Sequence, residues 1–198
     1  MHEGRVLGEP FFERRAPLVA RELLGKFLVG RINGWPVALP ITETEAYDGP
    51  ADRACHAHRG RTPRNAVMFG APGRWYVYLC YGMHWLLNIV TGPESYPAAV
   101  LIRGAGPVSG PGRLTRRYGI DRAQDGRPAE PNVGLWIEDR GLRVPRSRIE
   151  RTPRIGIAYA GPVWSAKPYR FVWKHDESAG TNGVRSKHGK SDGSSALG

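Results

Sequence analysis

Short apolar stretches alternate along this chain with breaks rich in glycine and proline, a pattern typical of strands joined by tight turns. Asn33-Gly34 between the first two stretches predicts a hairpin with a type I′ turn, and Pro36 and Pro40 confine its second strand to an edge. A further tight turn is expected at Gly82-Met83. The candidate strands are Phe27–Ile32, Trp35–Leu39, Ile41–Tyr47, Trp75–Tyr81, His84–Val90, Ala98–Arg103, Ile155–Tyr159 and Tyr169–Trp173.

Two segments have helical character. Apolar residues recur at helical spacing after Pro17, and Gly25 stands where a C-cap glycine is expected. A basic run, Arg113–Tyr118, ends at Gly119 in the same way. Because strands outnumber helices and hairpin links dominate, we expect an α+β fold, a single mixed domain on a curved, largely antiparallel β-sheet with a protruding β-hairpin.

The length of 198 residues suits one domain with a hydrophobic core of its own. We expect residues 1–175 to form that domain and 176–198, rich in Ser, Gly and Lys, to be disordered, since so few aliphatic residues cannot offset the entropy of ordering. The chain has no long apolar run and no secretory signal, and it has only two cysteines. These features predict a protein of the bacterial cytoplasm, associated with the nucleoid and not with a membrane.

The formal net charge of +11 indicates a polyanionic partner. Arginine outnumbers lysine, which suits bidentate contacts with phosphate oxygens. Acidic and basic residues cancel from Asp176 onward, so the whole excess lies on Met1–His175. The positive charge therefore belongs to the folded body and serves more than solubility.

The strand Ile41–Tyr47 places two carboxylates and an aromatic ring on one face, because side chains alternate along a strand. On its own, such a face is more often a solvated edge. The turn that follows Tyr47 can bring His56 back toward the same strand, which favours a functional face formed by Glu43, Glu45 and Tyr47.

A carboxylate such as Glu45 suits hydrolysis of a glycosidic bond, since it can serve as base for the attacking water and as counter-charge for an oxocarbenium-like sugar. Glycosidases ordinarily need a second carboxyl group as acid. A purine alkylated at N3 or N7 leaves from a cationic state and needs little protonation, so one carboxylate would suffice.

The stretch Trp75–Trp85 is unusually aromatic. Core packing explains Trp75 and Tyr76 about as well as a functional role does. Tyr81 adjoins the turn, where burial is hardest, and we expect it to be exposed and able to wedge between base pairs.

Metal binding is the competing explanation for the histidines and cysteines, but their spacing matches neither a Cys-x-x-Cys pair nor a His-Glu-x-x-His helix, so we expect no metal and no cofactor. Gly110-Pro111-Gly112 could place a helix N-terminus against a phosphate, although a plain loop-to-helix turn fits nearly as well. The residues weighed as metal ligands are Cys55, His56, His58, Cys80 and His84.

Several stretches in order carry a resemblance to a known family. Over about Phe11 to Phe171 the chain resembles the alkyladenine, or 3-methyladenine, DNA glycosylases, the vertebrate-type enzymes also common in bacteria. The stretches are Glu43-Thr44-Glu45-Ala46-Tyr47, Gly60-Arg61-Thr62-Pro63-Arg64-Asn65 with Met68-Phe69, Tyr76-Val77-Tyr78 through Tyr81-Gly82-Met83-His84 to Asn88, Val100-Leu101-Ile102-Arg103, Gly110-Pro111-Gly112 with Leu114, and Arg154-Ile155-Gly156-Ile157.

The resemblance implies a monofunctional hydrolase that flips damaged purines out of double-stranded DNA and cleaves their N-glycosidic bond, the first step of base excision repair. It implies that Glu45 is the general base and that Arg103 lies near the attacking water and the target phosphate. It also implies an intercalating role for Tyr81 in the minor groove. The remaining residues implied at the base-binding pocket are Tyr47, His56 and Tyr78 as stacking side chains, Asn88 as the group that rejects guanine, and Leu101 as a wall residue.

Alkylated purines are the first expected substrates, with hypoxanthine and etheno-adenine left open. A monomer is the default expectation for such a DNA clamp. A non-catalytic DNA-binding module is the alternative from another class, and it predicts that Glu45 is dispensable. Glycosylases of the helix-hairpin-helix class are set aside, because Gly110-Pro111-Gly112 only partly resembles the turn that they require.

Overall fold

The computed structural model describes residues 4–32 and 34–174. Its α-helices are α1 (Glu9–Phe12), α2 (Ala16–Leu23), α3 (Pro111–Tyr118) and α4 (Gly161–Ser165). Its strands are β1 (Arg5–Val6), β2 (Phe27–Ile32), β3 (Trp35–Asp48), β4 (Trp75–Cys80), β5 (His84–Thr91), β6 (Ala98–Ala105), β7 (Val108–Ser109), β8 (Leu135–Asp139), β9 (Ile149–Thr152) and β10 (Arg170–Trp173). Short 3-10 helices occur at His56–Arg59, Ala66–Phe69, Arg122–Gln124, Pro131–Val133, Arg146–Arg148 and Ala158–Ala160.

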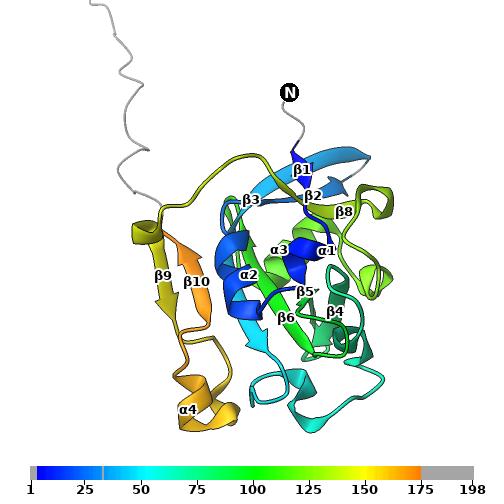
Figure 1. Ribbon diagram of the computed structural model, residues 1–198. Coiled ribbons are helices and arrows are strands. Elements are labelled where there is room, and N and C mark those ends of the chain that lie inside the picture. The colour runs from blue at the N-terminus through cyan, green and yellow to red at the C-terminus, as the bar shows by residue number, and fades with distance from the viewer. Residues whose placement is uncertain (1–3, 33, 175–198) are drawn as a thin grey trace, which may run out of the picture.

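The sheet is open, with strand order β1-β8-β2-β3-β6-β5-β4, and β7, β9 and β10 join beside this path. All the strand pairings that the described residues make are antiparallel. The expected mixed, largely antiparallel architecture is therefore confirmed. In Figure 1, β9, β10 and α4 lie on one side of α2, and β4 lies on the other.

Strand β3 organises the fold and corrects one prediction. Two strands were expected on either side of Pro40, but the structure has one strand of 14 residues. Its first half pairs with β2. Its second half pairs with β6 and, at three positions, with β10. At Pro36 and Pro40, β3 pairs with β2 alone among the described strands, so its other edge is unpaired there. Proline is tolerated where a strand has an unpaired edge, and β3 therefore continues through both prolines.

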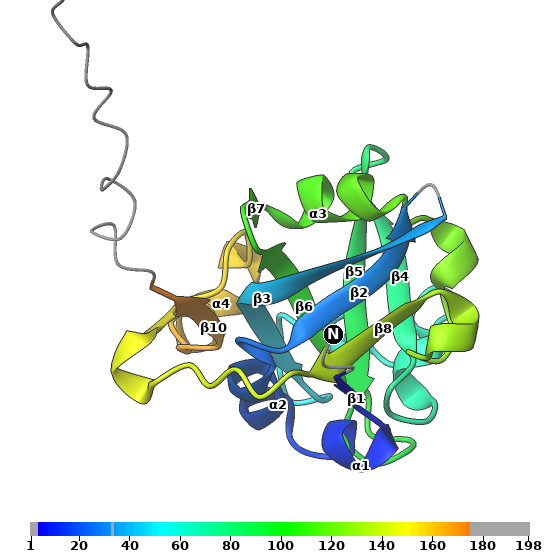
Figure 2. The same ribbon diagram turned by 90° about the horizontal axis from the view of Figure 1, so that it is seen from above.

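The two predicted helices are confirmed as α2 and α3. Gly25 follows α2 with a φ of +80°, and Gly119 ends α3 in the left-handed region. In Figure 2 the two helices lie at opposite sides of the view, with strands between them. The buried apolar residues of α2 and α3 join the main core, to which they contribute Ala16, Val19, Ala20, Leu23, Leu114 and Tyr118.

The predicted strand Ile155–Tyr159 is wrong. Ile155 and Tyr159 are exposed and Ile157 is buried, an alternation that imitates a strand. Gly156, however, has a φ of +75°, which breaks the extended backbone, and a 3-10 helix begins at Ala158. Sequence analysis also missed four short strands. The partners of β1 and β8 lie far away in the chain, whereas β9 pairs with the next strand, β10, and β7 pairs with the end of β6.

Other expectations have mixed outcomes. The hairpin Phe27–Ile32 with Trp35 onward is confirmed, while the predicted type I′ turn includes Asn33, which lies outside the described residues. The proposed tail, 176–198, also lies outside them. None of the helices that the structure describes is long and apolar enough to cross a bilayer.

Candidate active site

A cavity of about 900 Å³ opens beside the end of β3, and the eight residues that the resemblance implied for the site line it, whereas Glu43 does not. In Figure 1 the last part of β3 runs down between the α4 segment and the loops that follow β3. The predicted residues come from four strands, one hairpin tip and the 3-10 helix that begins at His56. They are Glu45, Tyr47, His56, Tyr78, Tyr81, Asn88, Leu101 and Arg103.

Glu45 is the one acidic residue among the described residues that line this cavity, and its side chain is 0% exposed. The Tyr47 hydroxyl donates a hydrogen bond of 2.9 Å to its Oε2. The backbone amide of Ile155 donates one of 2.8 Å to its Oε1. These contacts exclude the solvated-edge interpretation and fix the carboxylate in one orientation.

Arg103 on β6 connects Glu45 with Glu43. Its Nη1 lies 3.4 Å from Glu45 Oε1, and its Nε donates to Glu43 Oε1 at 2.7 Å. Arg170 on β10 donates to the same Glu43 oxygen at 2.6 Å. The register of β3 against β6 shifts on both sides of Glu43, a local irregularity of the kind that often adjoins active sites. The predicted sharing of one strand face by Glu43, Glu45 and Tyr47 is confirmed by these contacts.

Electrostatics differ between the two carboxylates. Burial raises the pKa of Glu45 above its ordinary value, although Arg103 and the Ile155 amide oppose the shift. For Glu43 burial also acts to raise the pKa, but hydrogen bonds from Arg170 and Arg103 outweigh it, and the net pKa is lowered. Glu45 is therefore the more basic of the two.

An aromatic group forms one wall of the cavity. The rings of His56 and Tyr78 pack edge to face with centroids 4.6 Å apart. His56 Nδ1 lies 2.8 Å from the Tyr76 hydroxyl. Burial, followed by the charge of Arg64, lowers the pKa of His56 and so favours its neutral form. Trp75 and Tyr76 are both buried; Trp75 belongs to the main core, whereas Tyr76 reaches the cavity.

Asn88 and Leu101 face each other across β5 and β6. Asn88 is 3% exposed, and its Nδ2 donates a hydrogen bond of 3.1 Å to the Tyr76 carbonyl. This bond fixes the orientation of the amide at the cavity wall. Leu101 is buried beside it.

Tyr81 lies at the turn between β4 and β5 and is 86% exposed, as predicted. The turn includes Tyr81 itself, one residue earlier than expected, and β4 ends at Cys80. Its φ of +50° lies in the left-handed region, which costs a non-glycine residue about 1 to 2 kcal/mol. Exposed aromatic surface combined with backbone strain is typical of a residue retained for function. Met83, two residues on, is also exposed.

Sequence reasoning did not assign a role to several residues that shape the site. Ile155 supplies a hydrogen bond through its backbone, and Arg154 with Asp52 forms a buried pair behind Tyr47. Arg154 and Ile155 belong to one of the stretches that carried the family resemblance, but a backbone contact over 110 positions leaves no signature in side-chain types. Among the described residues, no group of three or more His, Cys, Asp or Glu side chains is arranged to hold a metal ion.

Comparison with known proteins identifies the family of the chain. The family model described as methylpurine-DNA glycosylase matches residues 10–110 and 107–177. The chain belongs to this family and is thus a DNA glycosylase, a hydrolase of N-glycosidic bonds.

Relatives that carry the provisional name 3-methyladenine DNA glycosylase extend the match. One from Anaeromyxobacter dehalogenans (strain 2CP-C) is 48% identical over 173 residues, which covers 84% of this chain and 82% of the relative. One from Methanocella arvoryzae is 44% identical, with 86% and 93% covered, and one from Myxococcus xanthus is 46% identical, with 86% and 90% covered.

Proposed function

We propose that this protein excises purines alkylated at N3 or N7, 3-methyladenine among them, from double-stranded DNA, after the damaged nucleotide has turned out of the helix into the 900 Å³ cavity. The product is an abasic site, the starting point for base excision repair. The observation that carries the proposal is the fully buried Glu45 carboxylate, oriented by two donors at the wall of an aromatic cavity. Hypoxanthine and etheno-adenine are further candidate substrates.

Glu45 acts as general base on a water that attacks C1′ of the flipped nucleotide. Its raised pKa makes it a stronger base than a solvated glutamate, and burial keeps it free of competing water. Arg103 lies at one carboxylate oxygen, where its charge keeps Glu45 ionised between turnovers. As positive charge develops on the sugar, the ionised carboxylate also stabilises the transition state.

The cavity suits a leaving base that already carries positive charge. The rings of Tyr47 and Tyr78 offer π faces that attract a cationic purine more strongly than a neutral one. His56, held neutral beside Tyr76, adds no repulsion. Because an N3- or N7-alkylated purine is the better leaving group as well, binding and chemistry favour the same substrates.

Two further roles complete the proposal. Tyr81 enters the minor groove and occupies the gap left by the flipped nucleotide, which offsets part of the few kcal/mol that unstacking requires. Asn88, whose amide is oriented by its hydrogen bond to the Tyr76 carbonyl, rejects guanine through collision with its 2-amino group. The protein acts without strand cleavage, since no lysine occurs among the described residues that line the cavity and a Schiff-base step has no amine to use. We propose that it acts as a monomer.

The substitution Glu45→Gln tests the proposal. It keeps the size of the side chain and removes the base, so single-turnover release of alkylated purine should fall at least about 100-fold. Affinity for lesion-containing duplex should persist, because the aromatic cavity is unchanged. Release is followed by mass spectrometry on duplexes that carry methylated, deaminated or etheno purines.

Glu130→Gln is the matched control, an exposed glutamate outside the cavity that should release base at the wild-type rate. If Glu45→Gln released base as fast as this control, the proposed mechanism would be refuted. A non-catalytic DNA-binding module would instead release no base, with or without Glu45.

A further inference from the structure

The Asp52–Arg154 pair is completely buried behind the catalytic end of β3. Both side chains are 0% exposed, and Arg154 donates two hydrogen bonds to Asp52, of 2.5 and 2.9 Å. Asp52 also accepts from the backbone amides of Asp48 and Ala54. Buried ion pairs contribute little net stability, because desolvation of the two charges cancels most of their attraction. A role in placing neighbouring groups explains the pair better than a role in stabilising the fold.

Arg154 contacts both segments that supply hydrogen bonds to Glu45. Its Nη1 donates 2.8 Å to the carbonyl of Ala46, the residue between Glu45 and Tyr47. Its guanidinium carbon lies 4.8 Å from the centre of the Tyr47 ring. The next residue in the chain, Ile155, donates its amide to Glu45 Oε1.

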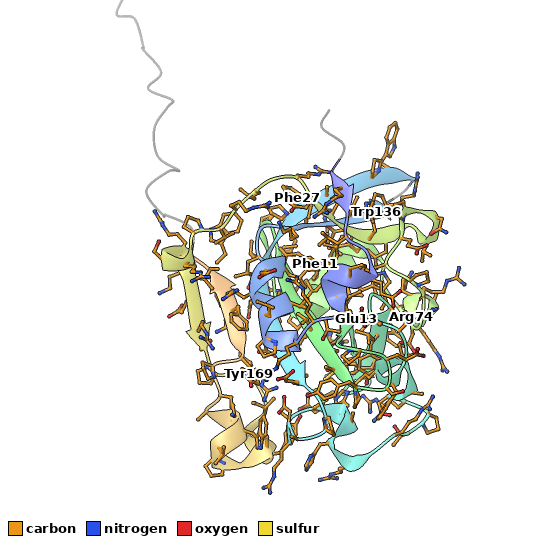
Figure 3. All side chains as sticks on the ribbon, viewed as in Figure 1. Phe11, Glu13, Phe27, Arg74, Trp136 and Tyr169 are labelled. Carbon is orange, nitrogen blue, oxygen red and sulfur yellow. The ribbon has the colours of Figure 1, made fainter. Side chains whose placement is uncertain are left out.

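The arrangement is specific to this place. The Nε of Arg154 is buried and has no hydrogen-bond partner in the described part of the chain. The guanidinium thus takes an orientation that bonds Asp52 and Ala46 through its Nη atoms and leaves Nε unsatisfied. Tyr169, labelled in Figure 3, directly precedes β10. Its carbonyl accepts a hydrogen bond from the Ala46 amide, and its ring centre is 5.3 Å from the guanidinium carbon of Arg154. The catalytic end of β3 is thus held from two sides.

We infer that Asp52 and Arg154 are positioning residues for base release: the pair fixes Ile155 and Tyr47 relative to Glu45, so that both carboxylate oxygens keep their donors during the reaction. The inference rests on the proposed role of Glu45. Small displacements of reacting groups are costly, since a misplacement of about 1 Å can slow a reaction about 100-fold.

Asp52 also neutralises Arg154. An unopposed guanidinium near Glu45 would favour the ionised carboxylate and lower the pKa of Glu45, which would make it a weaker base. Burial is the largest influence on Glu45, and the pKa of this carboxyl group is raised. The other charged or titratable groups around Glu45 are Glu43 and Tyr47 on β3, Arg103 on β6, Tyr78 on β4, and Arg170 on β10 behind Glu43.

The experiment compares Asp52→Asn with Asp139→Asn. Asp139 also forms an ion pair of low exposure, with Lys26 at 2.7 Å, and accepts a hydrogen bond from a backbone amide. Unlike the Asp52–Arg154 pair, it lies away from the cavity. Single-turnover base release is measured across pH, together with affinity for duplex that contains an uncleavable abasic analogue and with thermal stability.

Asp52→Asn should lower the maximal rate about 10- to 100-fold. It should also move the acid limb of the pH profile to lower pH, because the unopposed Arg154 charge lowers the pKa of Glu45. Affinity for the abasic duplex should be unchanged, because the pair is buried behind the cavity. Asp139→Asn should lower only thermal stability. A wild-type rate and pH profile for Asp52→Asn, or an equal slowing by Asp139→Asn, would overturn the inference.

Arg154→Lys provides a second measurement if Asp52→Asn fails to fold. Lysine keeps the buried charge but cannot reach Asp52 with two donors and Ala46 at once, so the rate should again fall with affinity retained. A parallel fall in affinity would refute a positioning role. Glu45→Gln is assayed beside these variants: release by that variant would count against the proposed base, whereas its inactivity combined with normal Asp52→Asn kinetics would count against the pair alone.

Discussion

The hydroxyl of Tyr47 stabilises one ionisation state of Glu45, so its removal should have a pH-dependent effect. Tyr47→Phe deletes the 2.9 Å donor to Glu45 Oε2 and keeps the ring. The side chain of Glu45 is 0% exposed, so bulk water does not compensate for the lost donor as it would at an exposed carboxylate. A hydrogen bond to a charged group contributes about 1.5 to 3 kcal/mol to stability, and we expect a loss of that size in the free energy of unfolding at neutral pH.

The sign of the pH dependence follows from linkage. Burial raises the pKa of Glu45 in the folded protein, so folding disfavours the ionised form of this side chain. The contribution of Glu45 to the free energy of unfolding therefore declines as pH rises through its folded pKa. The Tyr47 hydrogen bond opposes that raise, and its loss raises the pKa further. Tyr47→Phe therefore has its full effect on the free energy of unfolding at pH values above the folded pKa of Glu45 in the variant. Below the ordinary glutamate pKa, where Glu45 is protonated, the deficit should shrink to the roughly 0.5 to 1.5 kcal/mol of a neutral hydrogen bond.

Urea unfolding of wild type and variant at about pH 7.5 and about pH 4 measures both quantities. Tyr118→Phe is the matched control, since the Tyr118 hydroxyl donates 2.9 Å to a neutral acceptor, the Leu28 carbonyl. Its deficit should be the same at both pH values. In single-turnover assays the acid limb of Tyr47→Phe should move to higher pH. Equal deficits for Tyr47→Phe at both pH values, or an acid limb moved to lower pH, would refute the reasoning.

Three further predictions concern the hairpin tip, the cavity wall and the absence of strand cleavage. Tyr81→Gly should relieve the left-handed strain and leave the melting temperature unchanged or raised, while single-turnover release from duplex slows; a normal rate would contradict the wedge. Asn88→Gly should increase release of undamaged guanine, measured by mass spectrometry on unmodified duplex, and an unaltered product profile would contradict the gate. Borohydride added during turnover should trap no covalent adduct with DNA, because the described cavity wall has no lysine; a trapped adduct would show a lyase step.

The side chains of the site could be found in the sequence because their positions follow from local rules. Alternation along Ile41–Tyr47 places Glu45 and Tyr47 on one face whatever the rest of the fold does. Exposure of Tyr81 follows from its place at a hairpin turn. The resemblance added Arg103 and Asn88, and the structure places all of these side chains on one cavity.

Contacts between distant segments could not be found in this way. The segment Ile155–Tyr159 has the alternation of a strand, yet a left-handed Gly156 turns its backbone so that the Ile155 amide meets Glu45. The strands β1, β8 and β9 are short, and their pairing depends on partners that no local pattern specifies. Pro40 indicated a break, but the change of partners from β2 to β6 lets β3 continue through it.

Residue type and the two-residue period of a strand are local properties, so the order of residues along the chain was enough to identify the side chains that could do the chemistry. The burial of Glu45, the donors that orient it and the meeting of Asp52 with Arg154 behind it follow only from the folded arrangement, because they depend on the packing of segments about 100 residues apart. Desolvation and hydrogen bonding set the basicity of a carboxylate, and both are products of that packing.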